Sequence, residues 1–384
     1  MDFAHLLTDT YAIVLLAVGA AAFVYLALSY GLTFLRMGIV KEADSKTDTA
    51  SGGGLPSVSV VLVAQNNADM LRQHIPGLLE QDYPNYEVVV VDYESKDDTE
   101  FVLQLCEENF PNLKRVKISE NVNFFHGKKY PLAIGIKSAK NDIIVLTDVD
   151  CEPESENWLR SVVKGYKSAA TKIVLAPTRL DAKPGLLGIL ERYDNRVYHC
   201  QFMSAATLGH VYTGLGSNLS YRRSFFFEND GFIRHYLEPY GDDDIFVNRN
   251  GRKGNTEVVL NPDSMMKKDA PGTFALWSYM RRQRVMTRCY YSFIQRIRIV
   301  MRPLALALFY AACVLMFLEP MVPWVLPVAL LVLKLLWQEV CVWYGQRRFL
   351  LKNFHWASPL FELYFMVADT ILAIITLHRK RCNP

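Results

Sequence analysis

The chain has 384 residues, of which 51% are hydrophobic, and its 42 basic and 39 acidic side chains give a net charge of +3. This length and apolar content suffice for one large domain or two ordinary ones. The small net charge argues against the strongly basic surface that nucleic-acid-binding proteins carry, so we expect no nucleic-acid partner. The seven cysteines are scattered without a CxxC pair, which argues against a zinc site or a disulfide framework.

The first long apolar run, Tyr11 to Leu35, contains no charged side chain. Its 25 residues are enough, at about 1.5 Å per helical residue, to cross a hydrocarbon core of roughly 30 Å. No Lys or Arg precedes the run, so it lacks the basic start of a signal peptide, whereas Arg36 and Lys41 follow it. We therefore expect residues 1–40 to be a retained transmembrane anchor that leaves the next domain cytoplasmic. Residues 41–56 have no apolar period and are expected to be a linker.

After this linker, short β-rich runs alternate with helical stretches. The runs are Val58 to Val63, Glu87 to Val91, Arg115 to Ile118, Ile143 to Leu146 and Ile173 to Ala176. This order predicts an α/β fold with a mostly parallel sheet, flanked by transmembrane helices. Ligands of such sheets bind beyond the carboxyl ends of the strands, so polar residues there are candidate site residues.

Three further apolar runs lie near the end of the sequence, at 303–318, 323–344 and 359–377. The first two are typical of a helical hairpin, which would place Arg347 and Arg348 on the cytoplasmic side. If the third run spanned the membrane, it would bury Glu362 and Asp369 and carry a basic cluster across. For 359–377 both a spanning and an interfacial helix therefore remain open.

Two carboxylates one residue apart, Asp148 and Asp150, directly follow the apolar run that ends at Leu146. Such oxygen ligands suit Mg²⁺ or Mn²⁺ bridging a diphosphate. Acidic pairs also occur in ordinary surface turns, but a position at a buried strand end favours the metal site. Asp92 ends another apolar run, and we expect it to accept a hydrogen bond from a nucleobase N–H, while Asp97 or Ser95 caps a helix.

Several segments in chain order carry a resemblance to a known family. They are Pro56–Asn67, Val91–Thr99, Gly127–Ala133, Thr147–Cys151, Gly214–Arg222 and Gly241–Asp244. Together they resemble family 2 glycosyltransferases of the GT-A fold over about residues 56–300. The resemblance implies a Rossmann-like GT-A catalytic domain over 57–275 that transfers sugar from a nucleotide-sugar with inversion.

The resemblance also implies roles for individual residues. Ala64, Asn66 and Asp92 would hold the base and ribose, and Lys128 would lie near the donor. Asp148 would contact the donor and share the metal with Asp150. Other residues implied at the site are Asn218 as a sugar or acceptor contact and Arg281 and Arg284 as partners of the diphosphate.

Three adjacent aspartates, Asp242, Asp243 and Asp244, resemble the family's Glu-Asp pair, which supplies the general base. Like charges side by side favour protonation of one of them, which yields a usable base. Aligning the apolar residues that follow favours Asp244 as the base, with Asp243 second. The alternative is that at least one simply stabilises an acidic helix start.

The segment 276–302 combines basic and aromatic side chains, as an interfacial helix on anionic lipid would. Processive family members carry Gln-x-x-Arg-Trp in this region. Here Arg284 matches but Val285 replaces the Trp, which puts processive synthesis in doubt.

The sequence therefore predicts a membrane-anchored glycosyltransferase at the cytoplasmic face of a bacterial inner membrane. A UDP-sugar is the donor that the family favours, and a lipid acceptor is expected before a glycan acceptor. The alternatives are a processive polysaccharide synthase, a nucleotidyltransferase and a non-catalytic membrane scaffold. A nucleotidyltransferase would need a Gly-rich phosphate loop after Ala64, where the sequence instead has Gln65-Asn66-Asn67. A scaffold would tolerate loss of one group of acidic site residues, but Asp92, the pair Asp148 and Asp150, and the run Asp242–Asp244 are all present.

Overall fold

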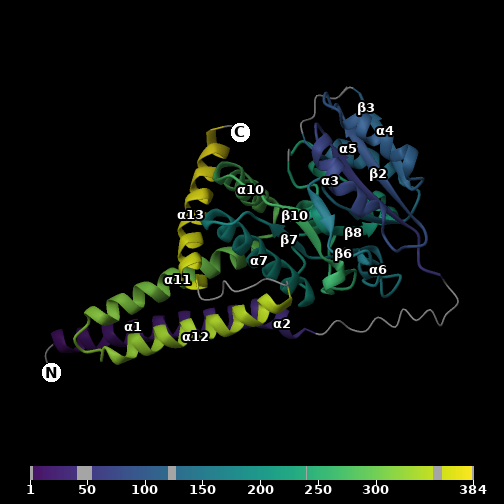
Figure 1. The fold of residues 1–384 in the computed structure, drawn as a ribbon. Helices are drawn as coiled ribbons and strands as arrows, with labels where there is room; N and C mark the ends of the chain where they lie inside the picture. The colour runs from purple at the N-terminus through teal and green to yellow at the C-terminus, as the bar shows by residue number, and fades with distance from the viewer. Residues whose placement is uncertain (1–2, 41–53, 120–126, 239, 349–356, 383–384) are drawn as a thin grey trace. The chain divides into compact units, whose positions relative to one another are not determined.

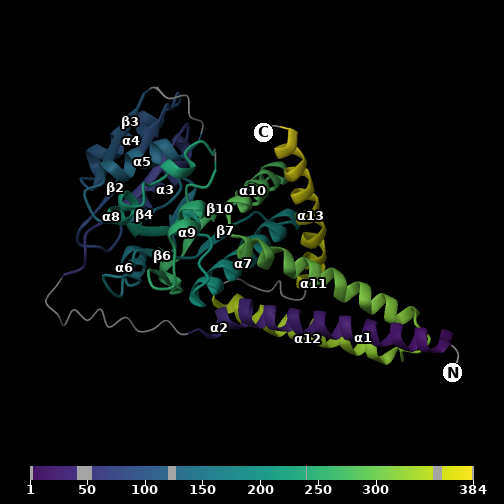
Figure 2. The same ribbon diagram turned by 180° about the vertical axis from the view of Figure 1, so that it is seen from behind.

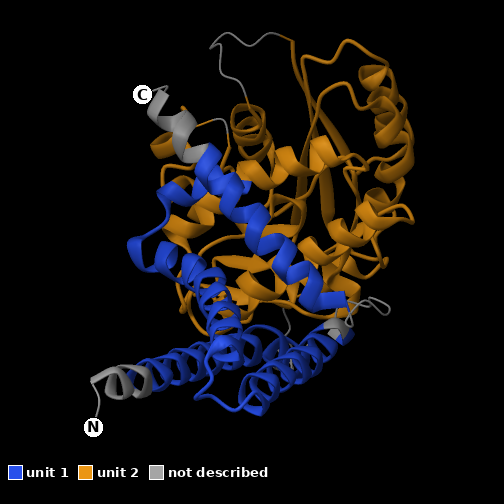
Figure 3. Ribbon diagram, turned by 90° about the vertical axis from the view of Figure 1, so that its left-hand side faces the viewer, with its two compact units in different colours: residues 1–40, 284–384 blue, residues 41–283 orange. Residues whose placement is uncertain are grey.

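The computed structural model describes residues 3–40, 54–119, 127–238, 240–348 and 357–382. These residues form two compact units, which Figure 3 colours separately. One unit comprises residues 1–40 and 284–384, and the other comprises residues 41–283. Most of the expected linker, residues 41–53, lies outside the described residues.

The unit of residues 41–283 is built on a seven-stranded sheet in the order β3-β2-β1-β4-β8-β6-β9. Its strands are β1 (Val58–Ala64), β2 (Tyr86–Tyr93), β3 (Leu113–Ile118), β4 (Ile143–Leu146), β6 (Ile173–Leu175), β8 (Leu219–Arg222) and β9 (Thr256–Val258). The five expected strands are all present, and the α/β class is confirmed. Strand β8, which the sequence did not reveal, runs antiparallel between β4 and β6.

Helices cover both faces of this sheet (Figure 1). The helices of this region are α3 (Ala68–Leu79), α4 (Thr99–Asn109), α5 (Lys129–Ser138), α6 (Trp158–Val163), α7 (Leu186–Thr207), α8 (Arg223–Glu228) and α9 (Asp244–Asn250). Helix α10 (Phe274–Thr287) follows them and extends past residue 283 into the other unit. Alternate residues of β1 point to opposite faces. Val60 and Leu62 join the core with α3, α4 and α6. On the other face, Gly135 of α5 lies so close that a Cβ there would be 2.7 Å from Val61 Cγ1.

A second sheet has three strands in the order β5-β10-β7, and its strand β5 follows β4 in the sequence. It comprises β5 (Cys151–Pro153), β7 (Thr178–Asp181) and β10 (Met266–Asp269). The pairing of β10 with β5 puts Lys268 opposite Cys151. A residue remote in sequence is thereby brought beside the Asp148–Asp150 turn.

The other unit is helical and contains α1 (Phe3–Tyr30), a π-helical segment η1 (Gly31–Leu35), α2 (Arg36–Ile39), α11 (Phe293–Leu318), α12 (Val325–Arg348) and α13 (Ser358–Cys382). Four stretches in it are long and apolar enough to cross a membrane: Thr10–Ile39, Phe293–Leu318, Val325–Gly345 and Ser358–Ile375. Helix α11 begins ten residues before the expected position 303, at a capping box formed by Ser292 and Gln295. The range 276–302 is therefore divided between α10 and α11 instead of forming one helix.

Buried charges tie α13 to the helices beside it. Lys334 Nζ of α12 lies 2.9 Å from Glu362 Oε2 of α13, and Arg302 Nη2 of α11 lies 3.2 Å from Glu362 Oε1. Figures 1 and 2 both show α13 running across the direction of α1 and α12. Its exposed apolar side chains, Leu360, Tyr364, Val367, Ile371 and Ile374, recur at intervals of three or four residues, which places them on one face of the helix.

Candidate active site

Asp92 marks one end of the candidate site, at the carboxyl end of β2. The parallel register of β1 and β2 sets Asp92 directly beside Ala64. The Asp92 side chain is 2% exposed, and its Oδ1 has no hydrogen-bond partner among the described residues. Because an unsatisfied buried acceptor is costly, this oxygen is well placed to accept from a ligand.

The two loops beyond these strands are hydrogen-bonded to each other. The Asn66 N–H donates to Ser95 Oγ at 3.0 Å, and Asn66 Oδ1 accepts from the Lys96 N–H at 2.8 Å. Asp97 accepts from the N–H groups of Ala68 and Thr99, in agreement with its expected capping role. Asn66 has a positive φ of 54°, so the loop is held in a conformation that non-glycine residues rarely adopt. The result is a preformed cradle next to Asp92.

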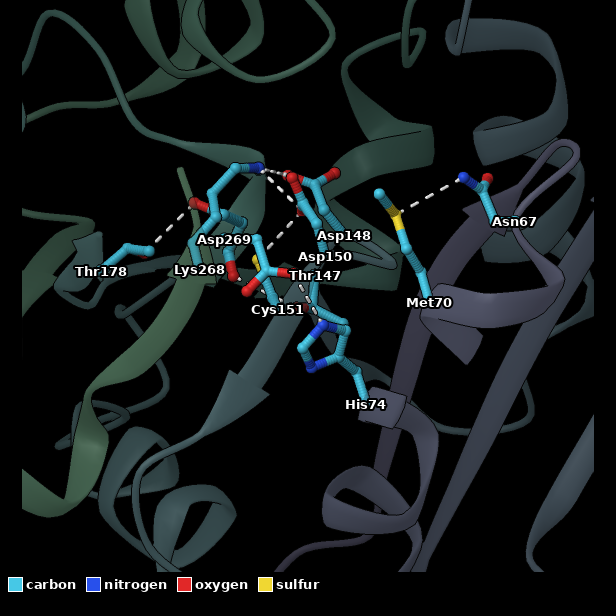
Figure 4. A network of polar contacts seen from close by, with 12 residues as sticks. Asn67, Met70, His74, Thr147, Asp148, Asp150, Cys151, Thr178, Lys268 and Asp269 are labelled. Atoms are coloured by element: carbon cyan, nitrogen blue, oxygen red, sulfur yellow. Dashed lines mark hydrogen bonds and ion pairs between the residues drawn. The ribbon is translucent and has the colours of Figure 1, made fainter. Parts of the chain in front are cut away.

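Asp148 and Asp150 lie in the turn between β4 and β5, surrounded by lysines. Lys128, the N-cap residue of α5, forms an ion pair with Asp148. Lys268 Nζ lies 2.7 Å from Asp148 Oδ2 and 3.1 Å from Asp150 Oδ1 (Figure 4). Burial by itself would raise the pKa of Asp148, but Lys128 and Lys268 outweigh it and hold the pKa well below its usual range. Asp148 is therefore ionised at any physiological pH.

The side chains of this turn fit a hard divalent cation. Oxygens of Asp148 and Asp150 and the Cys151 sulfur lie within 4.8 Å of one another. Carboxylate oxygens are the ligands that Mg²⁺ and Mn²⁺ prefer. Burial raises the pKa of the Cys151 thiol, which keeps it protonated and a poor ligand. The two aspartates are thus the candidate metal ligands, with Lys268 in contact with both.

Lys129, next to Lys128, points to a different part of the site. Its Nζ donates to the carbonyl oxygens of His235, Glu238 and Tyr240, at 2.7, 2.8 and 2.7 Å. Burial lowers the pKa of Lys129 to about 8, against the opposing effect of nearby carboxylates. The lysine therefore fixes the loop that leads into the three adjacent aspartates.

Among these aspartates, Asp243 has the properties of a base. Its Oδ1 accepts from the Asp244 N–H at 2.7 Å and its Oδ2 accepts from the Gly216 N–H at 2.8 Å, so its carboxylate is fixed. Burial, together with the charges of Asp242 and Asp244, raises the pKa of Asp243 to about 8. Asp244 is buried as the first residue of α9. These properties make Asp243 a candidate base beside Asp244, and the identity of the base stays a prediction.

Two other expected site residues are engaged within the protein. Asn218 is buried, its Nδ2 donates to the carbonyls of Pro177 and Ser264, and its Oδ1 accepts from Trp158 Nε1. Arg281 pairs with Asp194 and lies over the Trp277 ring. These contacts support structural roles for both residues. Arg284 belongs to the helical unit, and its role stays a prediction.

Sequence reasoning did not find Lys268 or the role of Lys129. Lys268 lies in a short strand without a recognisable motif, 120 residues from Asp148. Lys129 was inside the segment Gly127–Ala133, but adjacent lysines in a sequence do not reveal which of them faces the donor. Knowledge that β10 pairs with β5 would have indicated that Lys268 lies at the site.

Comparison with known proteins gives a family match over part of the chain. Residues 59–227 match the model for glycosyl transferase family 2. The glycosyltransferase AglE of Haloferax volcanii is 27% identical over 122 residues, which cover 31% of this chain and 38% of AglE. The beta-monoglucosyldiacylglycerol synthase of Trichormus variabilis is 27% identical over 139 residues, covering 36% of this chain and 29% of the synthase. This chain therefore matches well under half the length of either relative.

A solved structure extends the likeness of the fold to most of the chain. The mannosyltransferase PcManGT from Pyrobaculum calidifontis, in complex with GDP-Man and Mn²⁺, superimposes with a TM-score of 0.61 at 19% identity, covering 96% of this chain and 99% of that one. At this identity the likeness concerns the fold alone. Together with the family match over residues 59–227, this likeness of fold agrees with the resemblance to family 2 glycosyltransferases of the GT-A fold that the sequence predicts.

Proposed function

We propose that this protein transfers a glycosyl group from a nucleoside diphosphate sugar to an acceptor hydroxyl, with inversion at the anomeric carbon. The observation that carries the proposal is the ion cluster of Asp148, Asp150, Lys128 and Lys268. It combines ligands for a diphosphate-bound cation with cations for the diphosphate itself. Asp242 is close enough to raise the pKa of Lys128, so this first of the three adjacent aspartates borders the same cluster.

The residues divide the reaction between them. The free Asp92 oxygen accepts from the base of the donor, and Asp148 and Asp150 would hold the divalent ion. When bound, this ion supplies neutralisation of the charge that develops on the leaving diphosphate. Lys128 stabilises the same charge as the anomeric C–O bond breaks. Asp243 takes the proton of the acceptor hydroxyl. At the same time the acceptor oxygen bonds to the anomeric carbon, on the side opposite the leaving diphosphate.

The donor and acceptor can be narrowed by chemistry and by the relatives. UDP is the nucleotide that the sequence favours, while the mannosyltransferase with the similar fold binds GDP-Man, so both nucleotides are candidate donors. The Trichormus variabilis relative is named for a glucosyldiacylglycerol. A lipid acceptor fits a catalytic domain attached to apolar helices better than a growing polysaccharide does, because Val285 replaces the aromatic residue of processive enzymes.

For the membrane we propose three crossings, by α1 with α2, α11 and α12, with the catalytic domain on the cytoplasmic side of a bacterial inner membrane. Helix α13 lies along the membrane surface in this arrangement. Its apolar stripe faces lipid, and the charge of Asp369, in the middle of the helix, stays out of the hydrocarbon core. The basic run that follows Leu377 then remains on the cytoplasmic side, in accordance with the positive-inside rule.

Nucleotide release by the detergent-solubilised protein tests the proposal. The protein is incubated with UDP- and GDP-sugars in the presence of Mn²⁺ or Mg²⁺, with a lipid extract as acceptor source. We expect release of one nucleotide, loss of that release with a chelator, and loss of at least a hundredfold in Asp150→Ala, as is typical when a group that stabilises the transition state is removed. Full activity of Asp150→Ala together with independence from metal would refute the mechanism.

A further inference from the structure

Lys268 is distinguished by contacting both candidate metal ligands at once. Lys128 pairs with Asp148 alone, whereas the Lys268 ammonium contacts oxygens of both Asp148 and Asp150 (Figure 4). No other Lys or Arg of the described residues forms an ion pair with both aspartates. Two lysines and two aspartates give this cluster a net charge of zero, which weakens its attraction for a further cation.

The backbone fixes Lys268 in this position. The N–H of the next residue, Asp269, donates to the Asp150 carbonyl at 2.9 Å, and Lys268 itself is in register with Cys151. The Lys268 side chain is only 15% exposed and lies against both carboxylates. Lys268 is therefore an anchored group and differs from a mobile surface lysine.

We infer that Lys268 acts as an internal counter-ion that competes with the divalent cation for Asp148 and Asp150, so that metal and nucleoside diphosphate bind together. This inference rests on the proposed function. A divalent ion alone has to displace the ammonium from two carboxylates and leave it without a partner. A metal bound to a nucleoside diphosphate brings phosphate oxygens, which provide the Lys268 ammonium with new acceptors. Lys268 is thus a positioning residue that makes metal affinity depend on the donor.

Manganese binding to the solubilised full chain tests the inference without any turnover. The Mn²⁺ affinity is measured by electron paramagnetic resonance, first without nucleotide and then with saturating UDP or GDP. We expect nucleotide to strengthen Mn²⁺ binding at least tenfold in the native protein, within the usual range of roughly 5–150-fold for coupled sites. In Lys268→Met we expect nucleotide-free Mn²⁺ binding to tighten about tenfold and the dependence on nucleotide to fall by a similar factor.

Lys267→Met is the matched control. Lys267 is the preceding residue of β10, its side chain points to the opposite face, and it pairs with Glu152 at 2.8 Å. This variant loses the same charge, so its Mn²⁺ affinity should stay within about twofold of the native value, because charges at a distance are screened. Lys268→Gln provides a second, polar replacement, and thermal unfolding identifies any variant that fails to fold.

The outcomes separate the inference from the proposed function. Native Mn²⁺ affinity in both folded Lys268 variants, or an equal gain in Lys267→Met, overturns the inference while nucleotide binding still supports the proposed function. If no nucleotide or nucleotide-sugar binds to the native protein under any metal condition, the proposed function is wrong, and the coupling inferred for Lys268 is overturned with it.

Discussion

The pH dependence of transfer provides a direct test of Asp243 as the base. A base must be ionised to accept a proton, and the pKa of Asp243 is raised to about 8. At pH 7 only about one molecule in ten therefore carries the ionised form. We expect kcat/KM for the acceptor to rise about tenfold for each pH unit below 8 and to level off above it. Asp243→Asn should abolish transfer at every pH.

Asp242→Asn tests the cause of this shift. After burial, the charge of Asp242 is the largest contribution to the raised pKa of Asp243. Two unit charges ~6 Å apart at an effective dielectric constant of ~20 interact by about 3 kcal/mol, so removing one should lower the pKa by roughly 1–2 units. The part of the pH profile in which kcat/KM rises should move to lower pH by that amount, whatever happens to the maximal kcat/KM. Asp263→Asn, an exposed aspartate outside the cluster, is the control and should leave this part of the profile in place.

Stability supplies an independent measurement. Since the folded-state pKa of Asp243 lies above its usual value, its contribution to stability is fully present below about pH 4 and is lost as the pH rises through 8. The side chain that Asp243→Asn introduces cannot ionise, so this variant should have a higher melting temperature than the native protein at pH 9 but not at pH 4.

Two results would refute the assignment of Asp243 as the base. One is an activity profile that is flat between pH 6 and 9, and the other is an acidic part of the profile that Asp242→Asn leaves unchanged.

Four other substitutions or fusions have defined outcomes. Lys129→Met leaves three carbonyl oxygens without their donor, at a cost of about 1–3 kcal/mol each. This variant should therefore have a lower free energy of unfolding in urea and a lower kcat. The control Lys137→Met, on the exposed side of α5, should change neither quantity. Gly135→Ala should cost about 1–3 kcal/mol in the same unfolding assay, because its Cβ would meet side chains of β1 and β2 at 2.7 and 2.8 Å. Asn218→Ala should destabilise by about 2–4 kcal/mol with an unchanged donor KM, and a raised KM at native stability would instead support a sugar contact. A reporter fused after residue 384 should be cytoplasmic, whereas a reporter on the far side would mean that α13 spans the membrane.

The strands that the sequence revealed are those whose identity depends on local composition. Strands β1 and β2 contain the continuous apolar runs Val60–Ala64 and Val88–Val91, because a central parallel strand is buried on both faces. Strands β5, β7 and β10 have three or four residues each, too few for a period to appear. The start of α11 did have a local signal, since Ser292 and Gln295 have the spacing of a capping box.

The acidic residues of the site could be identified from the sequence, but their electrostatics could not. That Asp148 and Asp150 follow a buried strand is a local fact. That Lys268 neutralises both depends on the pairing of Lys268 with Cys151, 117 residues away in the sequence, which no local pattern encodes. Likewise, the fixed orientation of the Asp243 carboxylate depends on the Gly216 N–H, 27 residues away. Residue types were predictable, whereas their protonation depends on partners that only the fold supplies.

The start of α5 connects the two halves of the site. Lys128 and Lys129 are adjacent, and because successive helical residues diverge by about 100°, one contacts Asp148 while the other holds the loop before Asp242. Close packing of Gly135 on β1 and β2 fixes the position of this helix. The distance between the donor carboxylates and the base is therefore determined by one helix seated on the sheet. A substitution that shifts α5, such as Gly135→Ala, should consequently impair donor binding and proton transfer together, whereas substitutions at Lys128 or Asp243 affect one of them alone.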